Sequence, residues 1–120
     1  MKWDIEFHQD FDPEFDALPE DVQDEIRALA GALEAIGPLL GRPRVDTLNG
    51  SRYANMKELR VDASDGVWRV AFAFDPRRKA VLLAAGDKSG VSEKRFYRQL
   101  LEKADRRFDH HLSRIRKGRA

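Results

Sequence analysis

Three strand-like segments follow one another in the middle of the chain, with only short turns between them. They cover about residues 55–63, 67–74 and 79–88, and each is predicted to form a strand. Asp65-Gly66, between the first two, is a strong signal for a two-residue hairpin turn. Residues 75–78, with the sequence Asp-Pro-Arg-Arg, form the predicted second turn. Two short turns in succession predict an antiparallel sheet against which the rest of the chain must pack.

A long amphipathic helix is predicted before these strands. From Pro19 to Ile36 the apolar residues recur at steps of three and four, which makes one stripe along a helix. Pro19 suits the first turn, and Gly37-Pro38 stops the helix. Gly31 costs about 1 kcal/mol relative to alanine inside a helix, so we expect close packing at that position.

A second long helix is predicted after the strands. Residues 92–115 keep an apolar stripe throughout, and Ser92 is the expected N-cap. Arg116, Lys117 and Arg119 then place cations where they complement the negative end of the helix dipole.

Shorter elements complete the predicted fold. Residues 3–7 alternate apolar and acidic side chains, which predicts a strand with one buried face. Residues 9–16 read as a turn or a short helix, and residues 39–53 as an irregular basic connection. The predicted fold class is a compact α+β domain with a mainly antiparallel sheet, a helix or helical hairpin from the N-terminal part packed on one face, and a long C-terminal helix. We expect the helices to cover one side of the sheet.

Length and composition limit the number of domains, the cysteine chemistry and the cellular location that we expect for this protein. The chain has 120 residues, so we expect a single domain spanning residues 1–120. It has no cysteine, which excludes disulfides, zinc–thiolate sites and thiol catalysis. Lys2, Asp4 and Glu6 stand where a signal peptide would be apolar, and no apolar run approaches the roughly 20 residues that span a bilayer. We therefore expect a soluble, cytoplasmic protein.

Charge is distributed unequally along the chain. Residues 1–40 hold 11 acidic and 2 basic residues, whereas residues 41–120 hold 10 acidic and 20 basic residues. The small total of +1 thus conceals a net −9 in the first part and a net +10 in the second. Such asymmetry suggests a partner of one sign, most simply a phosphate backbone. The alternative interpretation is that the two parts of the chain form ordinary solvated surfaces that happen to differ in charge.

Strand pairing through the two turns gathers cations on one sheet face, because side chains alternate between faces. With Asp65-Gly66 as the turn, Asp62 pairs with Arg69, and Arg60 is a diagonal neighbour of Arg69. The predicted core face holds Leu59, Val61, Trp68, Val70, Phe72, Phe74, Val81 and Leu83. The predicted open face holds Glu58, Arg60, Asp62, Arg69, Ala71, Ala73, Leu82, Ala84, Gly86 and Lys88. An ordinary exposed face with cross-strand ion pairs is the alternative interpretation.

Several segments, taken together, resemble the RelE/ParE superfamily of type II toxin–antitoxin systems, most closely its HigB-like, phage-derived branch. They are Gly37-Pro38-Leu39-Leu40-Gly41-Arg42-Pro43, Asn55-Met56-Lys57-Glu58-Leu59-Arg60, Val67-Trp68-Arg69-Val70, Ala85-Gly86-Asp87-Lys88-Ser89 and Lys94-Arg95-Phe96-Tyr97. The resemblance implies a RelE-like fold and a toxin that cuts mRNA on the ribosome without a metal ion or other cofactor. It also implies a cognate antitoxin, often a helix-turn-helix protein, and contact with DNA only through the antitoxin complex.

Metal-free RNA cleavage needs a base for the 2′-hydroxyl proton, an acid for the leaving 5′-oxygen, and cations that stabilise the extra negative charge. Arg60 and Arg69 are the candidate phosphate clamp, because the guanidinium fork suits phosphate oxygens. Lys88 is a candidate for RNA binding or proton transfer and ranks above Lys57, which falls on the core-side parity of its strand.

Among the remaining candidates, Glu58 and Tyr97 each have two interpretations. Glu58 is a catalytic base or, as we prefer, the carboxylate that orients an arginine. Tyr97 stacks on a base or donates a proton, or else packs beside Phe96. Arg95 and Tyr53 are assigned to RNA binding. Related toxins carry histidine near Tyr53, so this chain departs from the family pattern there.

Histidine is the usual acid–base residue near neutral pH, and this chain has three: His8, His110 and His111. The last two lie far along the second long helix, where we expect a solvated surface rather than a catalytic role.

Two other functions remain open. A ParE-like toxin inhibits DNA gyrase by binding and is not catalytic, and its relatives lack the cationic face that Arg60, Arg69 and Lys88 form here. An inactive, basic RNA-binding relative is the third possibility.

Overall fold

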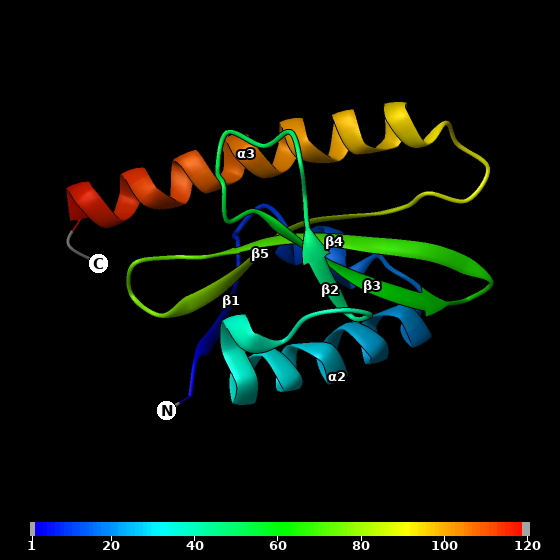
Figure 1. Ribbon diagram of the computed structural model, residues 1–120, viewed down its shortest axis with the longest axis horizontal. Coiled ribbons are helices and arrows are strands. Elements are labelled where there is room, and N and C mark those ends of the chain that lie inside the picture. The colour runs from blue at the N-terminus through cyan, green and yellow to red at the C-terminus, as the bar shows by residue number, and fades with distance from the viewer. Residues whose placement is uncertain (1, 119–120) are drawn as a thin grey trace.

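The computed structural model describes residues 2–118. Its elements alternate as the sequence predicts, with one additional short strand and one short 3-10 helix (Figure 1). In chain order they are β1 (Asp4–Phe7), α1 (Asp12–Asp16), α2 (Glu20–Ile36), η1 (Gly37–Leu39), β2 (Val45–Thr47), β3 (Lys57–Ala63), β4 (Gly66–Phe74), β5 (Lys79–Asp87) and α3 (Glu93–Gly118).

The strands form one five-stranded sheet in the order β1-β5-β4-β3-β2. The predicted antiparallel run of β3, β4 and β5 is confirmed, and β1 joins its edge in parallel with β5. The sequence missed β2, which pairs with β3 at the other edge. Three residues between prolines and glycines are too few to show an alternating pattern, so only the tertiary pairing reveals this strand.

Helices cover both faces of the sheet, so the prediction that they cover one side is wrong (Figure 1). One apolar cluster joins α1 and α2 to the face that includes Leu59, Val70 and Phe72. A second cluster joins α3 to the opposite face through Phe96, Leu100, Ala104 and other residues. The sheet face that was predicted to be open is therefore mostly covered by α3. The alanines on this face leave room for the helix to approach the sheet closely.

The hairpin between β3 and β4 turns one residue earlier than predicted. Its turn residues are Ser64 and Asp65, both with positive φ (51° and 56°), and Ala63 pairs with Gly66. Positive φ at both turn residues matches the twist that joins two antiparallel strands. Arg60 consequently lies directly opposite Arg69 rather than diagonal to it. The pairing shifts by two residues, so the face assignments of β3 and β4 are unchanged.

A bulge between β4 and β5 exchanges the predicted faces of much of β5. Phe72 pairs with Leu82, the next pair is Ala71 with Ala84, and Leu83 is the additional residue. Leu82 therefore packs on the α2 side, whereas Val81 and Leu83 pack under α3, opposite to the prediction. Both faces of this strand are apolar, so the sequence pattern could not specify its register.

The helices follow the predicted boundaries closely. The backbone N–H of Arg95 donates to Ser92 Oγ (3.4 Å), which is the expected N-cap interaction of α3. Gly31, in α2, is exposed, and a Cβ there would meet nothing within 4 Å, so the prediction of close packing is wrong. Arg119, predicted to lie at the end of α3, is outside the described residues. Across residues 2–118, no helix combines the length and apolarity needed to span a membrane.

Candidate functional site

A buried carboxylate lies at the centre of the cationic sheet face. Glu58, on β3, is only 3% exposed and faces α3. It accepts hydrogen bonds from the hydroxyl of Tyr97 (2.8 Å) and from Nε of Arg60 (3.1 Å). Nε of Arg69, on β4, lies 3.7 Å from Oε1 of the same carboxylate. We call these four residues, Glu58, Arg60, Arg69 and Tyr97, the Glu58 cluster.

Strand register explains why these side chains meet. Glu58 and Arg60 are two residues apart on β3 and so share a face, and Arg69 is the direct cross-strand partner of Arg60. Two like charges directly opposite each other are unfavourable by themselves. The Glu58 carboxylate contacts both guanidinium groups and offsets this repulsion.

Arg60 has a second acidic partner that sequence reasoning missed. Its Nη2 lies 3.0 Å from Oδ2 of Asp46, on the edge strand β2. The backbone N–H of Thr47 donates to Asp46 (2.8 Å) and, ahead of nearby arginines, holds the pKa of that carboxyl below its usual value. Finding Asp46 required knowing β2, for which the sequence carries no clear signal.

The two arginines differ in exposure. The Arg60 side chain is 35% exposed, whereas that of Arg69 is 11% exposed. Nη1 of Arg69 donates to the carbonyl of Trp68 (3.0 Å), and its buried Nε has no hydrogen-bond partner within residues 2–118. Arg60 is therefore the guanidinium that a ligand reaches first, and Arg69 adds positive charge behind it.

Arg60 and Tyr97 both have raised pKa values and keep their protons at neutral pH. The hydrogen bond to Glu58 raises the pKa of Arg60 above its ordinary value. Burial, followed by the hydrogen bond to Glu58, raises the pKa of Tyr97 above 10.0. The arrangement thus presents two permanent cations and a neutral hydroxyl, groups that can bind phosphate and stabilise added negative charge.

Lys88 adjoins the cluster through Tyr97. It follows β5 directly, and its Nζ lies 5.6 Å from the centre of the Tyr97 ring and 3.9 Å from Oε1 of Glu93. Asp87 accepts hydrogen bonds from the backbone N–H groups of Val67 and Ser89. These bonds stabilise the turn after β5 and thereby position Lys88.

Three of the predicted RNA-binding residues lie away from the cluster. Lys57 precedes Glu58 on β3 and so belongs to the opposite face of the strand. Tyr53 donates its hydroxyl to Asp109 and packs edge-on against Phe108. Asp109 is twelve residues beyond Tyr97 on α3, roughly 18 Å along the helix axis. Arg95 is exposed on the first turn of α3.

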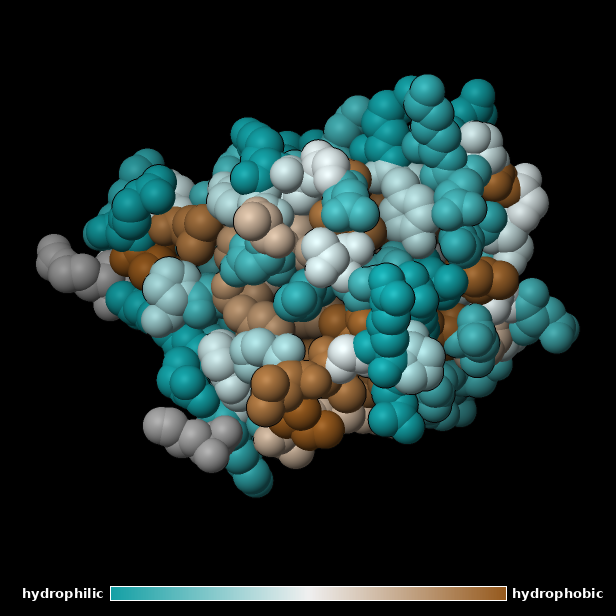
Figure 2. Space-filling model, in the orientation of Figure 1, coloured by the Kyte–Doolittle hydropathy of each residue, from teal (hydrophilic) through white to brown (hydrophobic). Residues whose placement is uncertain are grey.

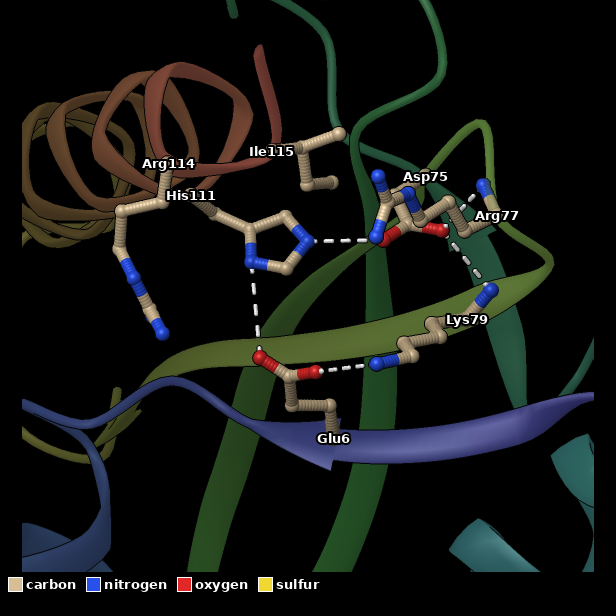
Figure 3. A pocket seen from close by; sticks show the side chains of 7 residues that line it. All are labelled: Glu6, Asp75, Arg77, Lys79, His111, Arg114 and Ile115. Atoms are coloured by element: carbon tan, nitrogen blue, oxygen red, sulfur yellow. Dashed lines mark hydrogen bonds and ion pairs between the residues drawn. The ribbon is translucent and has the colours of Figure 1, made fainter. Parts of the chain in front are cut away.

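His111 lies in a second polar cluster, near the far end of α3, with Glu6, Asp75 and Lys79 (Figure 3). His111 is buried, with Nε2 at 2.8 Å from Oδ2 of Asp75 and Nδ1 at 3.5 Å from Oε2 of Glu6. The prediction of a solvated helix surface is therefore wrong for His111. It follows Ala104 and Phe108 on the apolar stripe, a spacing that indicates burial.

This second cluster has a structural role, because it joins α3 to β1 and to the turn between β4 and β5. In Figure 3 its charged groups point toward one another around a small pocket, and Lys79 pairs with Glu6 (3.1 Å). Asp75 also accepts the backbone N–H groups of Arg77 and Lys79, which shapes the turn between β4 and β5. Within residues 2–118, no group of histidine and carboxylate side chains is arranged to hold a metal ion.

The outer surface differs between the two helical layers. Figure 2 shows a largely hydrophilic surface over α3 and an apolar patch on the α2 side of the molecule. Exposed large apolar side chains on that side include Ile36 and Leu39. The Glu58 cluster lies on the α3 side of the sheet.

Known proteins match both the sequence and the fold. Residues 13–109 match the family of phage-derived Gp49-like proteins (DUF891). Two candidate toxins of Mycobacterium tuberculosis are similar over 99 residues, or 82% of this chain: HigB2, which is 41% identical, and HigB3, which is 44% identical. The matched region covers 84% of HigB3 but 49% of HigB2, so the chain spans about half the length of that relative.

The fold matches a solved structure of the Escherichia coli toxin RelE, an arginine-to-alanine double variant in the free state. The TM-score is 0.62 at 13% sequence identity, and the match covers 89% of this chain and 98% of that one. At this identity the likeness shows the fold alone, and the family assignment comes from the sequence matches. The chain belongs to the phage-derived Gp49-like family, among the HigB-like proteins, and has a RelE-like fold.

Proposed function

We propose that this protein is the toxin of a type II toxin–antitoxin system and that it cuts mRNA on the ribosome without a metal ion. The observation that carries the proposal is the Glu58 cluster, which sets two arginines side by side with a tyrosine hydroxyl and Lys88 next to them. Membership of the HigB-like branch supports it. A cognate antitoxin neutralises the toxin, and the site of action is the cytoplasm, where ribosomes translate.

Each residue of the cluster has a role in this reaction. Arg60, the more exposed arginine, binds the scissile phosphate, and Arg69 stabilises the charge that develops on it. Glu58 orients both arginines and the hydroxyl of Tyr97. During the reaction this hydroxyl gives up its hydrogen bond to Glu58 and donates its one hydrogen to the leaving oxygen, as a hydrogen bond or as a proton. Lys88 contacts an adjacent phosphate or takes the proton of the attacking 2′-hydroxyl.

The more distant candidates act outside the bond-breaking step. Tyr53 is hydrogen-bonded to Asp109, which lies roughly 18 Å along α3 from Tyr97, so Tyr53 contacts the ribosome or a remote nucleotide rather than the scissile phosphate. Arg95 and Lys57 add backbone contacts to RNA, which are sequence-independent.

Mapping of RNA 5′ ends after induced expression tests the activity. Expression of the parent protein should arrest growth and create discrete new 5′ ends within translated reading frames. Growth arrest without such ends, but with inhibited DNA supercoiling, would replace this proposal by gyrase inhibition. RNA binding without arrest or cleavage would identify an inactive relative.

Arg69→Ala tests the assigned site against a matched control. Arg27, on α2, is also an arginine, is 58% exposed and forms its ion pair with Asp24 at 3.4 Å. Arg69→Ala should abolish the new 5′ ends while the protein still copurifies with its antitoxin, and Arg27→Ala should leave them unchanged. Full cleavage by Arg69→Ala would refute the site.

A further inference from the structure

The Asp46 carboxylate joins a third arginine to the two arginines of the Glu58 cluster. Oδ2 of Asp46 accepts a hydrogen bond from Nη2 of Arg60 (3.0 Å) and another from Nε of Arg42 (3.2 Å). Because both nitrogens contact the same oxygen, the two guanidinium groups are close neighbours. Asp46 pairs with Glu58 across β2 and β3, so its side chain lies on the sheet face that carries the Glu58 cluster.

The backbone attaches the loop that carries Arg42 to the strand that carries Arg60. The N–H of Arg60 donates to the carbonyl of Arg44 (2.9 Å), and the N–H of Arg44 donates to the carbonyl of Gly41 (3.2 Å). The position of Arg42 therefore depends on main-chain hydrogen bonds as well as on Asp46. A guanidinium whose position is fixed in advance loses less conformational freedom when it binds a ligand.

Most of the Arg42 guanidinium is available to a ligand. Of the five N–H donors of an arginine, the hydrogen bond to Asp46 uses only the one on Nε. The side chain is 78% exposed, and its terminal nitrogens make no hydrogen bond within residues 2–118. An ion pair this exposed contributes little to stability, so its main effect is on where the guanidinium lies.

The cations on this side of the sheet follow the order of four neighbouring strands. Lys88 follows β5, Arg69 lies on β4, Arg60 lies on β3, and Arg42 is held beside β2 by Asp46. A phosphate backbone that meets these cations in turn crosses the strands, with the scissile phosphate at the two central arginines. Arg42 then lies where the next phosphate on the β2 side arrives.

We propose that Arg42 is a further RNA-binding residue and that it contacts a phosphate next to the scissile one. The inference rests on the proposed function, because it concerns the RNA that the Glu58 cluster cuts.

Binding of a single-stranded RNA oligonucleotide at low ionic strength tests the contact without cleavage, provided that its 2′-hydroxyls are replaced by 2′-O-methyl groups. Arg42→Ala should weaken binding about tenfold, the cost of one hydrogen bond between charged groups. It should also reduce the salt dependence by the share of one phosphate contact. Arg44→Ala removes the same charge from an exposed position of the same loop and should change both quantities much less. Equal effects of the two substitutions would overturn the proposal.

Cleavage on programmed ribosomes identifies the phosphate. One uncharged methylphosphonate is placed in the mRNA at either of the two phosphates that flank the scissile one. At one of these positions it should slow cutting by the parent about tenfold at subsaturating protein. It should not slow Arg42→Ala further, because that variant has already lost the contact. Arg44→Ala should respond as the parent does.

The two experiments separate this inference from the proposed function. If the parent cuts no RNA but Arg42→Ala weakens oligonucleotide binding more than Arg44→Ala, the proposed function fails and the Arg42 contact stands. If the parent cuts RNA and the methylphosphonate slows Arg42→Ala as much as the parent at both positions, the contact is wrong and the proposed function stands.

Discussion

Glu58 lies between two arginines that oppose each other across neighbouring strands, so at the scale of the residue it is the group on which the site depends. Its carboxylate contacts Arg60, Arg69 and Tyr97 together. A carboxylate so engaged is poorly placed to take a proton from a substrate, and this favours its role as an orienting group. These residues could be assigned to one face from the sequence because strand alternation is local, whereas their contacts depend on register and on α3.

Replacement of Glu58 by glutamine should loosen the cluster. The loss of one charge leaves Arg60 and Arg69 facing each other without compensation, so we expect stability to fall by about 1–3 kcal/mol. Because Glu58 contributes to the raised pKa of Tyr97, that pKa should move back toward its ordinary value. Thermal unfolding and the tyrosine ultraviolet titration measure the two effects. Asp46→Asn is the control, because Asp46 contacts Arg60 alone among the residues of the cluster. An unchanged pKa of Tyr97 in Glu58→Gln would contradict the assigned contact between Tyr97 and Glu58.

His8 should make stability depend on pH below neutrality. The Asp10 N–H donates to its Nδ1 (3.0 Å), so Nε2 carries the proton and donates to Nδ1 of His110 (3.2 Å). Burial lowers the pKa of His8 below 6.5, so the unfolded chain binds a proton before the folded protein does. Its contribution to stability is therefore complete above pH 6.5 and is lost as the pH falls through the folded pKa.

Thermal melts at about pH 7.5 and about pH 5.5 measure this dependence. The parent should melt at a lower temperature at the acidic pH, and His8→Asn, whose oxygen still accepts from the Asp10 N–H, should show a smaller change between the two. An equal change in both proteins would show that His8 is not responsible.

At the scale of the element, the sequence predicted what local patterns control and missed what tertiary pairing controls. The two long helices and the three central strands follow from apolar periodicity. The bulge in β5 and the three-residue β2 do not, because a strand that is apolar on both faces has no preferred register and a very short strand has no pattern. The arginine pair was thus predicted on the correct face, and its partner Asp46 was not predicted at all.

Two glycines should respond in opposite directions to substitution by alanine. A Cβ at Gly31 in α2 would have nothing within 4 Å, so Gly31→Ala should stabilise the protein by about 0.5–1 kcal/mol. A Cβ at Gly86 in β5 would lie 2.9 Å from the Phe96 ring, so Gly86→Ala should destabilise it. Chemical denaturation of both variants checks the signs, and a stabilising Gly86→Ala would show that α3 packs less closely on β5 than this contact implies.

At the scale of the whole molecule, the sheet separates two helical layers of opposite charge. Helix α2 holds five acidic residues and one basic residue, whereas α3 holds nine basic and four acidic residues. Because α2 and α3 lie on opposite sides of the sheet (Figure 1), the charge asymmetry along the sequence becomes an asymmetry between two sides of the fold. The Glu58 cluster lies on the basic side, where Tyr97 of α3 contacts Glu58. RNA approaching from the α3 side would meet positive charge first.

This geometry predicts which charges govern binding to ribosomes. Arg98→Ala and Arg106→Ala, at exposed positions of α3, should each weaken binding and reduce its dependence on salt, because each removes a cation that displaces counterions from phosphate. Arg27→Ala, on the acidic side, should change neither. Sedimentation with ribosomes over a range of salt concentrations measures both quantities, and equal losses for all three variants would contradict an oriented approach.

Single-turnover cleavage of mRNA on programmed ribosomes by the purified protein tests the central claim most directly. The parent and Arg27→Ala should cut at equal rates, whereas Arg69→Ala should be slower by at least about a hundredfold, the usual cost of losing a preorganised charge-stabilising group. Cleavage by Arg69→Ala at the parent rate, or no cleavage by the folded parent protein, would contradict the assignment of the Glu58 cluster as an RNA-cleaving site.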